Sequence, residues 1–324
     1  MRASFISKIA LLLLGLFLFY PKPQTLKAEN LPGGGLTISP PLLELNLKPG
    51  ETYVGKIKIT NTSEKMMEVY PQAMNFRAKG EGGEPEFFSD DDSSNSYALS
   101  AWLKFSPRKL AFTLEQYTEW DFQIVVPQNA EPGGHYGVIF FSTEPPEVSK
   151  DITQIALQTK IGSLILVKVA GAIEESAFLK EFSAPHFLFK PPVDLVVRIQ
   201  NTGNVHIKPQ GEISLLNWQG KLLSELPINE KSNNVLPDST RKFDAQWQAT
   251  QKPFYKMPIG KFSGDIKIVY GETAKTLNGE VSFWVIPWWF IILVAIVLIF
   301  LIILIWRKIK KRRKRRKPER IIIR

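Results

Sequence analysis

The sequence contains no cysteine among its 324 residues. A fold held together by disulfides is therefore excluded, as are thiol catalysis and zinc or iron–sulfur sites built on cysteine. Stability must come from buried apolar surface. About 255 residues lie between the two chain ends, enough for one large domain or two smaller ones.

Histidine is almost as scarce, and no motif predicts catalysis. His135, His186 and His206 are scattered along the chain. His135 lies in a Pro-Gly-Gly turn before a strand, where a solvated residue is expected rather than a general base. The chain has no Gly-x-Ser-x-Gly elbow, and Gly80-Glu-Gly-Gly83 precedes no helical pattern that could bind phosphate. We therefore expect no enzyme and no cofactor, although a pair of carboxylates acting on a glycan stays open as an alternative.

Amphipathic helical periodicity is also missing between Leu36 and Val285. Short β-branched or aromatic runs with alternating polarity occur there instead, at 55–60, 120–126, 193–199 and 265–270. Turn sequences such as Lys48-Pro-Gly50 separate them. The run 154–170 contains β-rich residues and Gly162, so it is predicted to be a strand. The fold class is therefore predicted to be all-β.

Two internal similarities predict two domains. The first aligns Ile38-Ser-Pro40 with Phe105-Ser-Pro107 at an offset of 67 and continues into two alternating strands. Two pseudo-equivalent hairpins of a sandwich would share this pattern. The second is a strand that ends in Asn-Thr, at Asn61 and again at Asn201. We predict two immunoglobulin-like β-sandwiches, over residues 36–172 and 173–284.

A long apolar run follows the second domain. Residues 285–306 are 22 residues without a charge, which is enough to span a hydrocarbon core of about 30 Å. Trp288, Trp289 and Trp306 lie where aromatic side chains meet the two headgroup layers. This segment is predicted to be a single transmembrane helix.

The tail, residues 307–324, is strongly basic. Ten of its first eleven residues are Lys or Arg. By the positive-inside rule this cluster keeps the C-terminus in the cytoplasm. The residues expected to set this topology are Arg307, Lys308, Lys310, Lys311, Arg312 and Arg313.

The N-terminus, residues 1–28, has the pattern of a secretory signal peptide. Arg2 and Lys8 precede an apolar stretch at 9–20, and cleavage is expected after Ala28. An uncleaved signal anchor is the alternative. In both cases the chain is predicted to be a single-pass cell-membrane protein with extracellular N-terminal domains.

The net charge of +10 is concentrated at the two chain ends. The tail contributes +11 and the signal segment +4, which leaves 25 basic and 30 acidic residues, or −5, between them. A nucleic-acid partner is therefore not expected. The tail is expected to attract anionic lipid headgroups.

Two regions are candidates for partner binding. Asp90, Asp91 and Asp92 lie in the longest polar stretch, 77–96, which is expected to be a mobile excursion from the sandwich. Removal of residues 79–96 is expected to leave the fold intact. Asp90 and Asp92 are also weak candidates for a calcium site. Trp218, beside the Gln219-Gly220 turn, is expected to be exposed. Trp120 and Trp247 alternate with apolar neighbours and are expected in the core.

Several motifs of this sequence resemble those of a known protein family. The sequence Glu131-Pro-Gly-Gly-His-Tyr-Gly-Val-Ile-Phe-Phe141, together with Lys48-Pro-Gly-Glu51, Ile59-Thr-Asn-Thr-Ser63 and 102–107, resembles the WxL-interacting proteins of Gram-positive bacteria. The resemblance covers nearly the whole chain. It implies a signal peptide, two immunoglobulin-like domains, one membrane helix and a basic tail, with binding to peptidoglycan or to a partner protein.

These observations predict a non-enzymatic, membrane-anchored surface protein that binds another surface protein or the cell wall. A membrane-tethered assembly chaperone of the pilus-chaperone type is the first alternative, and it would offer a sheet edge to client strands. An exported glycan-active enzyme is the second.

Overall fold

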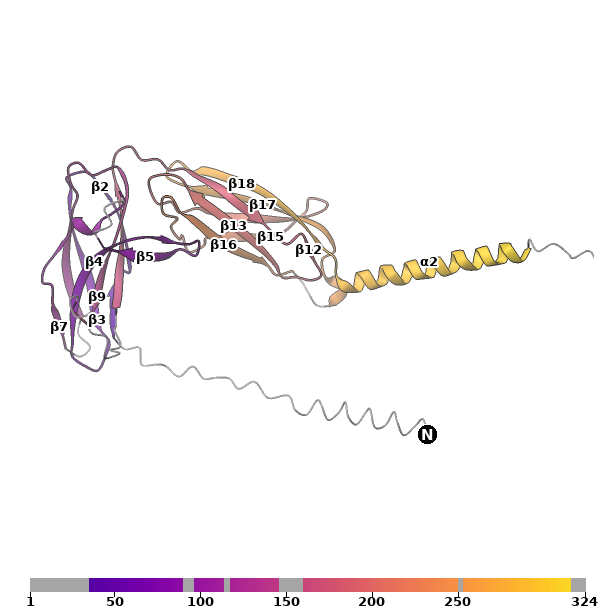
Figure 1. Cartoon of the computed structure of the whole chain (residues 1–324), viewed down its shortest axis with the longest axis horizontal. Coiled ribbons are helices and arrows are strands. Elements are labelled where there is room, and N and C mark those ends of the chain that lie inside the picture. The colour runs from indigo at the N-terminus through magenta and orange to yellow at the C-terminus, as the bar shows by residue number, and fades with distance from the viewer. Residues whose placement is uncertain (1–34, 90–95, 114–116, 146–159, 250–252, 316–324) are drawn as a thin grey trace, which may run out of the picture.

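The chain forms two β-sandwiches followed by one long helix in a computed structural model (Figure 1). The structure describes residues 35–89, 96–113, 117–145, 160–249 and 253–315. The predicted signal peptide and Asp90, Asp91 and Asp92 lie outside these ranges. The predicted fold class is confirmed: all-β, with two immunoglobulin-like sandwiches and a C-terminal apolar helix.

The first sandwich contains ten strands in two sheets. One sheet has the order β1-β3-β8-β6, and the other has the order β2-β10-β9-β4-β5, with β7 also paired to β4. A short 3₁₀ turn, η2 (Ser100–Trp102), precedes β6. The strands are β1 (Leu36–Ser39), β2 (Leu42–Leu47), β3 (Thr52–Asn61), β4 (Met67–Lys79), β5 (Glu84–Phe88), β6 (Leu103–Phe105), β7 (Leu110–Phe112), β8 (Tyr117–Val125), β9 (Gly133–Ser142) and β10 (Lys160–Val169).

The chain crosses from one sheet to the other at 39–41. β1 pairs antiparallel with β3, whereas β2 pairs parallel with β10. The predicted internal similarity corresponds to a repeated arrangement, because β1 pairs with β3 as β6 pairs with β8. The repeats are not hairpins as predicted, since β2 and β7 lie between the paired strands and join the opposite sheet.

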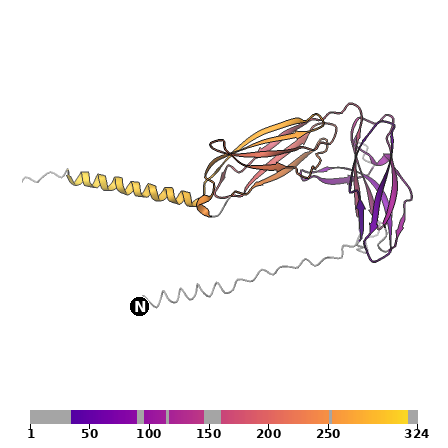
Figure 2. The same cartoon turned by 180° about the vertical axis from the view of Figure 1, so that it is seen from behind.

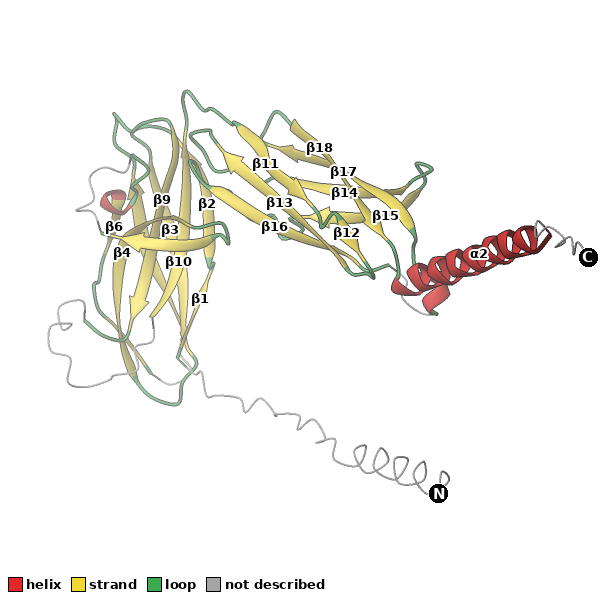
Figure 3. Cartoon of the chain, turned by 45° about the vertical axis from the view of Figure 1, so that its right-hand side comes forward, coloured by secondary structure: helices red, strands yellow, loops and turns green. Residues whose placement is uncertain are grey.

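The second sandwich contains eight strands and lies between the first sandwich and the helix (Figures 2 and 3). Its sheets have the orders β11-β13-β16 and β12-β18-β17-β14-β15, and a 3₁₀ turn, η3 (Phe254–Lys256), lies before β17. The strands are β11 (Ala177–Ser183), β12 (Phe187–Leu188), β13 (Val193–Asn201), β14 (Gln210–Asn217), β15 (Leu222–Ile228), β16 (Thr240–Trp247), β17 (Gly260–Tyr270) and β18 (Lys275–Val285).

Alternating residues fill the core of each sandwich. Trp120 packs among the buried residues of the first core, and Trp247 among those of the second. The predictions that both tryptophans are buried are therefore confirmed. Each core buries one face of each sheet, which is why the exposed positions between them are mostly polar.

The same buried asparagine closes a turn in each domain. The Asn61 amide nitrogen donates to the carbonyls of Lys65 and Thr113, at 2.8 and 3.0 Å. Asn201 donates in the same way to Val205 and Val235, at 2.8 and 2.9 Å. Both side chains are fully buried. The repeated Asn-Thr pattern therefore marks a structural element shared by the two sandwiches.

The polar segment 77–96 is not a mobile loop over its described part, so that prediction is wrong. β4 extends to Lys79, and β5 returns along it, with Phe76 paired opposite Phe87. The β4–β5 hairpin reaches across to the second domain near β16 (Figure 1). Polar composition misled the prediction because a hairpin that packs on only one face keeps its other side chains in solvent.

The C-terminal helix begins later than predicted. Val285 is the last residue of β18 and pairs with Gly260, and the helix α2 extends over Trp288–Arg315. The predicted start was three residues too early because an uncharged run does not distinguish a buried strand end from a helix. Residues 288–311 are long and apolar enough to cross a membrane.

Candidate functional site

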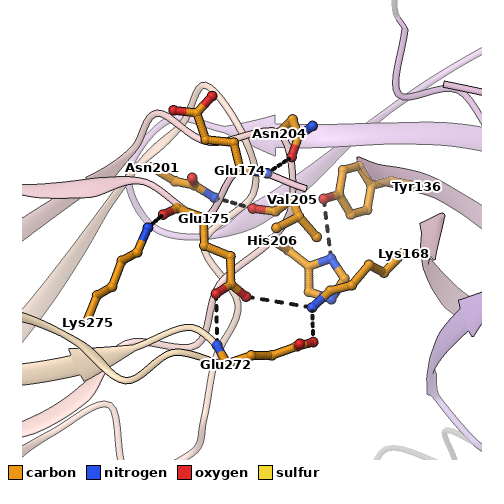
Figure 4. A network of polar contacts seen from close by, with 10 residues as sticks. All are labelled: Tyr136, Lys168, Glu174, Glu175, Asn201, Asn204, Val205, His206, Glu272 and Lys275. Atoms are coloured by element: carbon orange, nitrogen blue, oxygen red, sulfur yellow. Dashed lines mark hydrogen bonds and ion pairs between the residues drawn. The ribbon is translucent and has the colours of Figure 1, made fainter. Parts of the chain in front are cut away.

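The end of the second domain that faces the first is held to it by polar contacts. The Gly134 amide donates to the Asn204 carbonyl at 2.7 Å. The side chain of Asn204 also binds the linker between the domains, since it donates to Ala172 and accepts from the amide of Glu174 (Figure 4). The linker is thereby fixed at two points.

Gly133 allows this close approach. Its φ is +126°, and a Cβ added there would lie 2.6 Å from the Asn204 carbonyl oxygen. A side chain at this position would both strain the backbone and push the domains apart. The Pro-Gly-Gly sequence noted above therefore serves the contact between domains.

A titratable group lies in the same contact. His206 Nδ1 lies 3.3 Å from the hydroxyl of Tyr136, on the first domain. Beside it, Lys168 forms ion pairs with Glu272 at 2.7 Å and with Glu175 at 3.7 Å (Figure 4). Tyr136 on β9 and Lys168 on β10 thus contact three segments of the second domain. These are the linker before β11, the β13–β14 loop and the β17–β18 loop.

The β4–β5 hairpin makes a second bridge between the domains. Arg198 on β13 donates to Glu81 at the hairpin tip, at 2.5 Å, and also to Glu181 of its own domain. The amide of Lys242 on β16 donates to the Glu81 carbonyl at 2.8 Å. One hairpin residue is thus held through both its side chain and its backbone.

Between these contacts lies a cleft of about 240 Å³, which we call the interdomain cleft. Leu42, Leu164 and Leu166 form an apolar wall on the first domain. The cationic side chains of Arg77, Lys231 and Arg241 lie around it, with Glu84 the one acidic residue that lines it among the described residues. Arg241 donates to the Asn234 carbonyl at 2.7 Å, and burial lowers its pKa.

The edge of β10 is open beside this cleft. β2 pairs with β10 only from Leu164 onward, because the chain has just crossed between sheets. Among the described strands, none pairs with residues 160–163 on the side away from β9. The Leu164 amide donates to Pro41 on that side, so by alternation the N–H groups of Lys160 and Gly162 point to the open side.

The outer face of this sheet is apolar as well. Phe76, Tyr136, Val138, Phe140 and Leu166 form a cluster that is separate from the main core. All five side chains are buried, with Phe87 of the hairpin, Tyr97, and Leu236 of the second domain packed against them. The Lys160 ammonium lies 4.1 Å from the Phe140 ring centre. A sheet that is buried on only one side normally has a polar outer face, so this cluster shows that the hairpin and the second domain cover this sheet.

The sequence-predicted site residues are dispersed. Asp90, Asp91 and Asp92 lie outside the described residues, so neither their binding role nor a calcium site can be placed. Trp218 is 69% exposed, as expected, but it lies at the end of the second domain that faces away from the first. The described residues contain no group of three or more potential metal ligands.

His135 corrects a prediction. It is buried, not solvated, and its ring nitrogens lie 2.9 Å from the Glu131 carbonyl and 3.3 Å from that of Ala98. The strand begins earlier than the Pro-Gly-Gly turn suggested, since β9 starts at Gly133. Sequence reasoning also missed Glu81, Arg198 and His206, whose pairing depends on how the domains meet.

We expect the folded chain to lose stability as the pH falls from 6.5 to 5, because of His206 in the contact between the domains. Burial lowers the pKa of His206 from 6.5 to about 4, with Glu44 opposing and Lys168 and Lys208 adding to the shift. The unfolded chain therefore binds more protons in this window, and stability is lost on acidification, by about 2 kcal/mol at pH 5.

Thermal unfolding at pH 7, 6 and 5 measures this loss. The variant His206→Gln should reduce the pH dependence, whereas His186→Gln, in an exposed position, should leave it unchanged. An equal pH dependence in all three proteins would contradict the assignment to His206. The pH is not taken below 5, because Asp and Glu side chains ordinarily titrate below that value and would add their own pH dependence.

Comparison with known proteins finds distant similarity to solved structures. No protein-family model and no curated protein matches the sequence. A solved chaperone–tip adhesin complex of CFA/I fimbriae is similar at 11% identity and a TM-score of 0.39, over 78% of this chain and 100% of that one. The class 5 fimbriae chaperone CfaA has 12% identity and a TM-score of 0.38, over 78% and 100% of the two chains. The E. coli chaperone DraB has 13% identity and a TM-score of 0.34, over 78% and 97%.

These neighbours correct the main functional prediction. A protein that binds another surface protein or the cell wall was expected, but the similar structures are chaperones of fimbriae, so that prediction is wrong. At these identities the likeness itself shows the fold alone, and the resemblance to the WxL-interacting proteins stays a prediction.

Proposed function

We propose that the chain is a membrane-tethered assembly chaperone that holds an extended segment of another exported protein at the open edge of β10. The observation that carries the proposal is the row of outward N–H and C=O groups over residues 160–163. An open edge of this kind pairs readily with another strand, and main-chain hydrogen bonds then provide affinity without a fixed sequence.

The interdomain cleft supplies the side-chain selectivity in this proposal. The open edge ends at Leu164, which is also the first β10 residue that lines the cleft. The cleft volume of about 240 Å³ is below the 300–1,000 Å³ typical of sites for drug-sized ligands. It therefore suits an apolar side chain of an extended segment, and Lys231 and Arg241 favour a negative group next to it.

The membrane part of the proposal follows from α2 and the tail. Residues 288–311 would cross the membrane, and Arg307, Lys308, Lys310 and Lys311 would keep the tail in the cytoplasm. Trp289 and Trp306 are 17 residues apart, about 26 Å along a helix, which places them near the two headgroup layers. Both sandwiches would then face outward, where a client emerges. No catalytic step belongs to this role.

Site-specific crosslinking tests the proposal. Because the chain has no cysteine, Lys160→Cys provides a single attachment point for a membrane-impermeant maleimide–benzophenone reagent on intact cells. Lys56→Cys, on the exposed middle of β3, is the matched control. We expect polypeptide adducts from position 160 and few from position 56. Hydrogen exchange should then show protection of the Gly162 amide when the captured protein is bound.

Two results would contradict the proposal. Equal adduct yields at the two positions would indicate random contact rather than an edge site. Adducts without protection of Gly162 would show that the partner contacts side chains and adds no strand. If the reagent reaches neither position on intact cells but both after lysis, the outward orientation is wrong.

A further inference from the structure

The end of the second domain that faces away from the first carries a group of exposed aromatic side chains. The strand register places three residue pairs at this end: Phe187 with Trp284, Val285 with Gly260, and Asn217 with Phe262. Trp218 follows Asn217 and lies beside Gly260. The exposed aromatic side chains at this end, which we call the basal aromatic group, are Phe187, Phe189, Trp218, Tyr255 and Trp284.

The loops at this end differ in charge from those at the opposite end. Loops 184–192, 218–221 and 248–259 contain four lysines and no acidic residue. The loops that face the first domain, 170–176, 202–209, 229–239 and 271–274, contain five acidic residues, two lysines and no Phe, Tyr or Trp. Aromatic and basic side chains are thus collected at one end of a single sandwich.

The connection to α2 holds this end close to the helix. Only Ile286 and Pro287 lie between β18 and α2. The Ile286 amide donates to the Leu188 carbonyl at 2.8 Å, and the Phe290 amide donates to Pro287 at 3.0 Å, so the connection is itself structured. Two residues span at most about 7 Å, close to the thickness of one headgroup layer, which is about 5–8 Å.

We infer that the basal aromatic group lies in the headgroup layer of the membrane that α2 crosses, and that it docks the second domain on the lipid surface. Tryptophan and tyrosine favour this layer because their rings are apolar and their N–H or O–H groups remain hydrated. Lys190, Lys221 and Lys256 lie in the loops at the same end and favour anionic headgroups. Trp218, a partner-binding candidate from the sequence, is thereby assigned to lipid.

The docking would fix the distance between the membrane surface and the proposed client site at β10. If the second domain stands on the membrane and the linker is fixed by Asn204, the open edge of β10 is held at a set height above the lipid. The inference rests on the membrane insertion of α2, which belongs to the proposed function. It does not depend on whether a client binds at β10.

Depth-dependent fluorescence quenching tests the inference on the full chain. Single cysteines at Phe187→Cys and Trp218→Cys are labelled with an environment-sensitive dye and reconstituted into vesicles of phosphatidylcholine and phosphatidylglycerol. Nitroxide quenchers are placed either on the headgroups or at the middle of the acyl chains. Glu230→Cys, at the opposite end of the same domain, and Leu298→Cys, within α2, are the controls.

The headgroup quencher should reduce emission at positions 187 and 218 several-fold more than at position 230. The acyl-chain quencher should act mainly at position 298. If positions 187 and 218 behave like 230 while 298 is quenched, the docking is absent although the anchor is inserted. If 298 is not quenched either, the anchor and the docking both fail.

A substitution variant gives a second measurement. Phe187, Phe189 and Trp218 are replaced by serine, and the label is placed at Tyr255→Cys. Because all three side chains are exposed, the sandwich should remain folded. Headgroup quenching at position 255 should fall several-fold relative to the same label in the unsubstituted chain. Unchanged quenching would overturn the inference.

Discussion

Replacing Asn201 by alanine is expected to lower the free energy of unfolding of the second domain by about 3 kcal/mol. The amide nitrogen donates to two carbonyls, and Oδ1 accepts from the Gly203 amide at 2.9 Å. The side chain has no exposed surface. Alanine removes all three bonds. The Val235 carbonyl still accepts from the Ile207 amide and the Gly203 amide still donates to Ser176. The loss is therefore about 1 kcal/mol for each of these two bonds, with about 1–3 kcal/mol for the buried Val205 carbonyl.

Urea denaturation followed by tryptophan fluorescence measures this loss. Trp247 reports on the second core and Trp120 on the first. The control is Asn217→Ala, in an exposed turn where Oδ1 accepts from the amides of Gln219 and Lys221. Water can replace those bonds, so a change within about 0.5 kcal/mol is expected. If both variants lost a similar free energy of unfolding, the burial of the Asn201 side chain would not explain the loss.

Reversing the charge at Arg198 is expected to release the first domain from the second. The variant Arg198→Glu loses the hydrogen bonds to Glu81 and Glu181 and places a third carboxylate beside them. Only the bond to Glu81 joins the two domains, since Glu181 belongs to the same domain as Arg198. Reversing the charge replaces this attraction by repulsion between carboxylates, so we expect the docked population to fall.

Distances between two spin labels measure this coupling. Labels at Glu64→Cys and Glu225→Cys lie on exposed sites, one on each domain. The parent chain should give one narrow distance distribution, and Arg198→Glu a broad one. The control is Lys56→Glu, which breaks an exposed ion pair with Glu119 within the first domain and should leave the distribution narrow. A narrow distribution in Arg198→Glu would show that the hairpin does not hold the domains.

The two predictions differ in how far the sequence supports them. The Asn-Thr pattern at Asn61 and Asn201 is visible in the sequence, and the structure shows why it recurs. In each domain the amide joins the carbonyl four residues later to a carbonyl more than 30 residues away in the chain, 52 residues for Asn61 and 34 for Asn201. The Glu81–Arg198 contact has no signal in the sequence, because neither residue belongs to a recognisable motif.

Errors of prediction occurred where local patterns are ambiguous. The run from Val285 was predicted to be helical throughout, although Val285 ends a strand, because apolar composition alone does not decide between a buried strand and a helix. His135 was predicted to be solvated from its turn sequence. Its ring packs against Trp102, with ring centres 4.3 Å apart, and lies beside the Ala98 carbonyl, 37 residues away in the chain.

The sequence by itself determined the strands, the turns, the two-sandwich organisation and the apolar helix with its basic end. These features depend on alternation, turn residues and hydrophobic length, which act between neighbours along the chain. Only the tertiary structure decided the interdomain cleft, the open edge of β10 and the position of Trp218. Residues as far apart as Glu81 and Arg198, separated by 117 positions, meet there. Contacts of this kind depend on the mutual orientation of two folded domains, and no local pattern encodes that orientation.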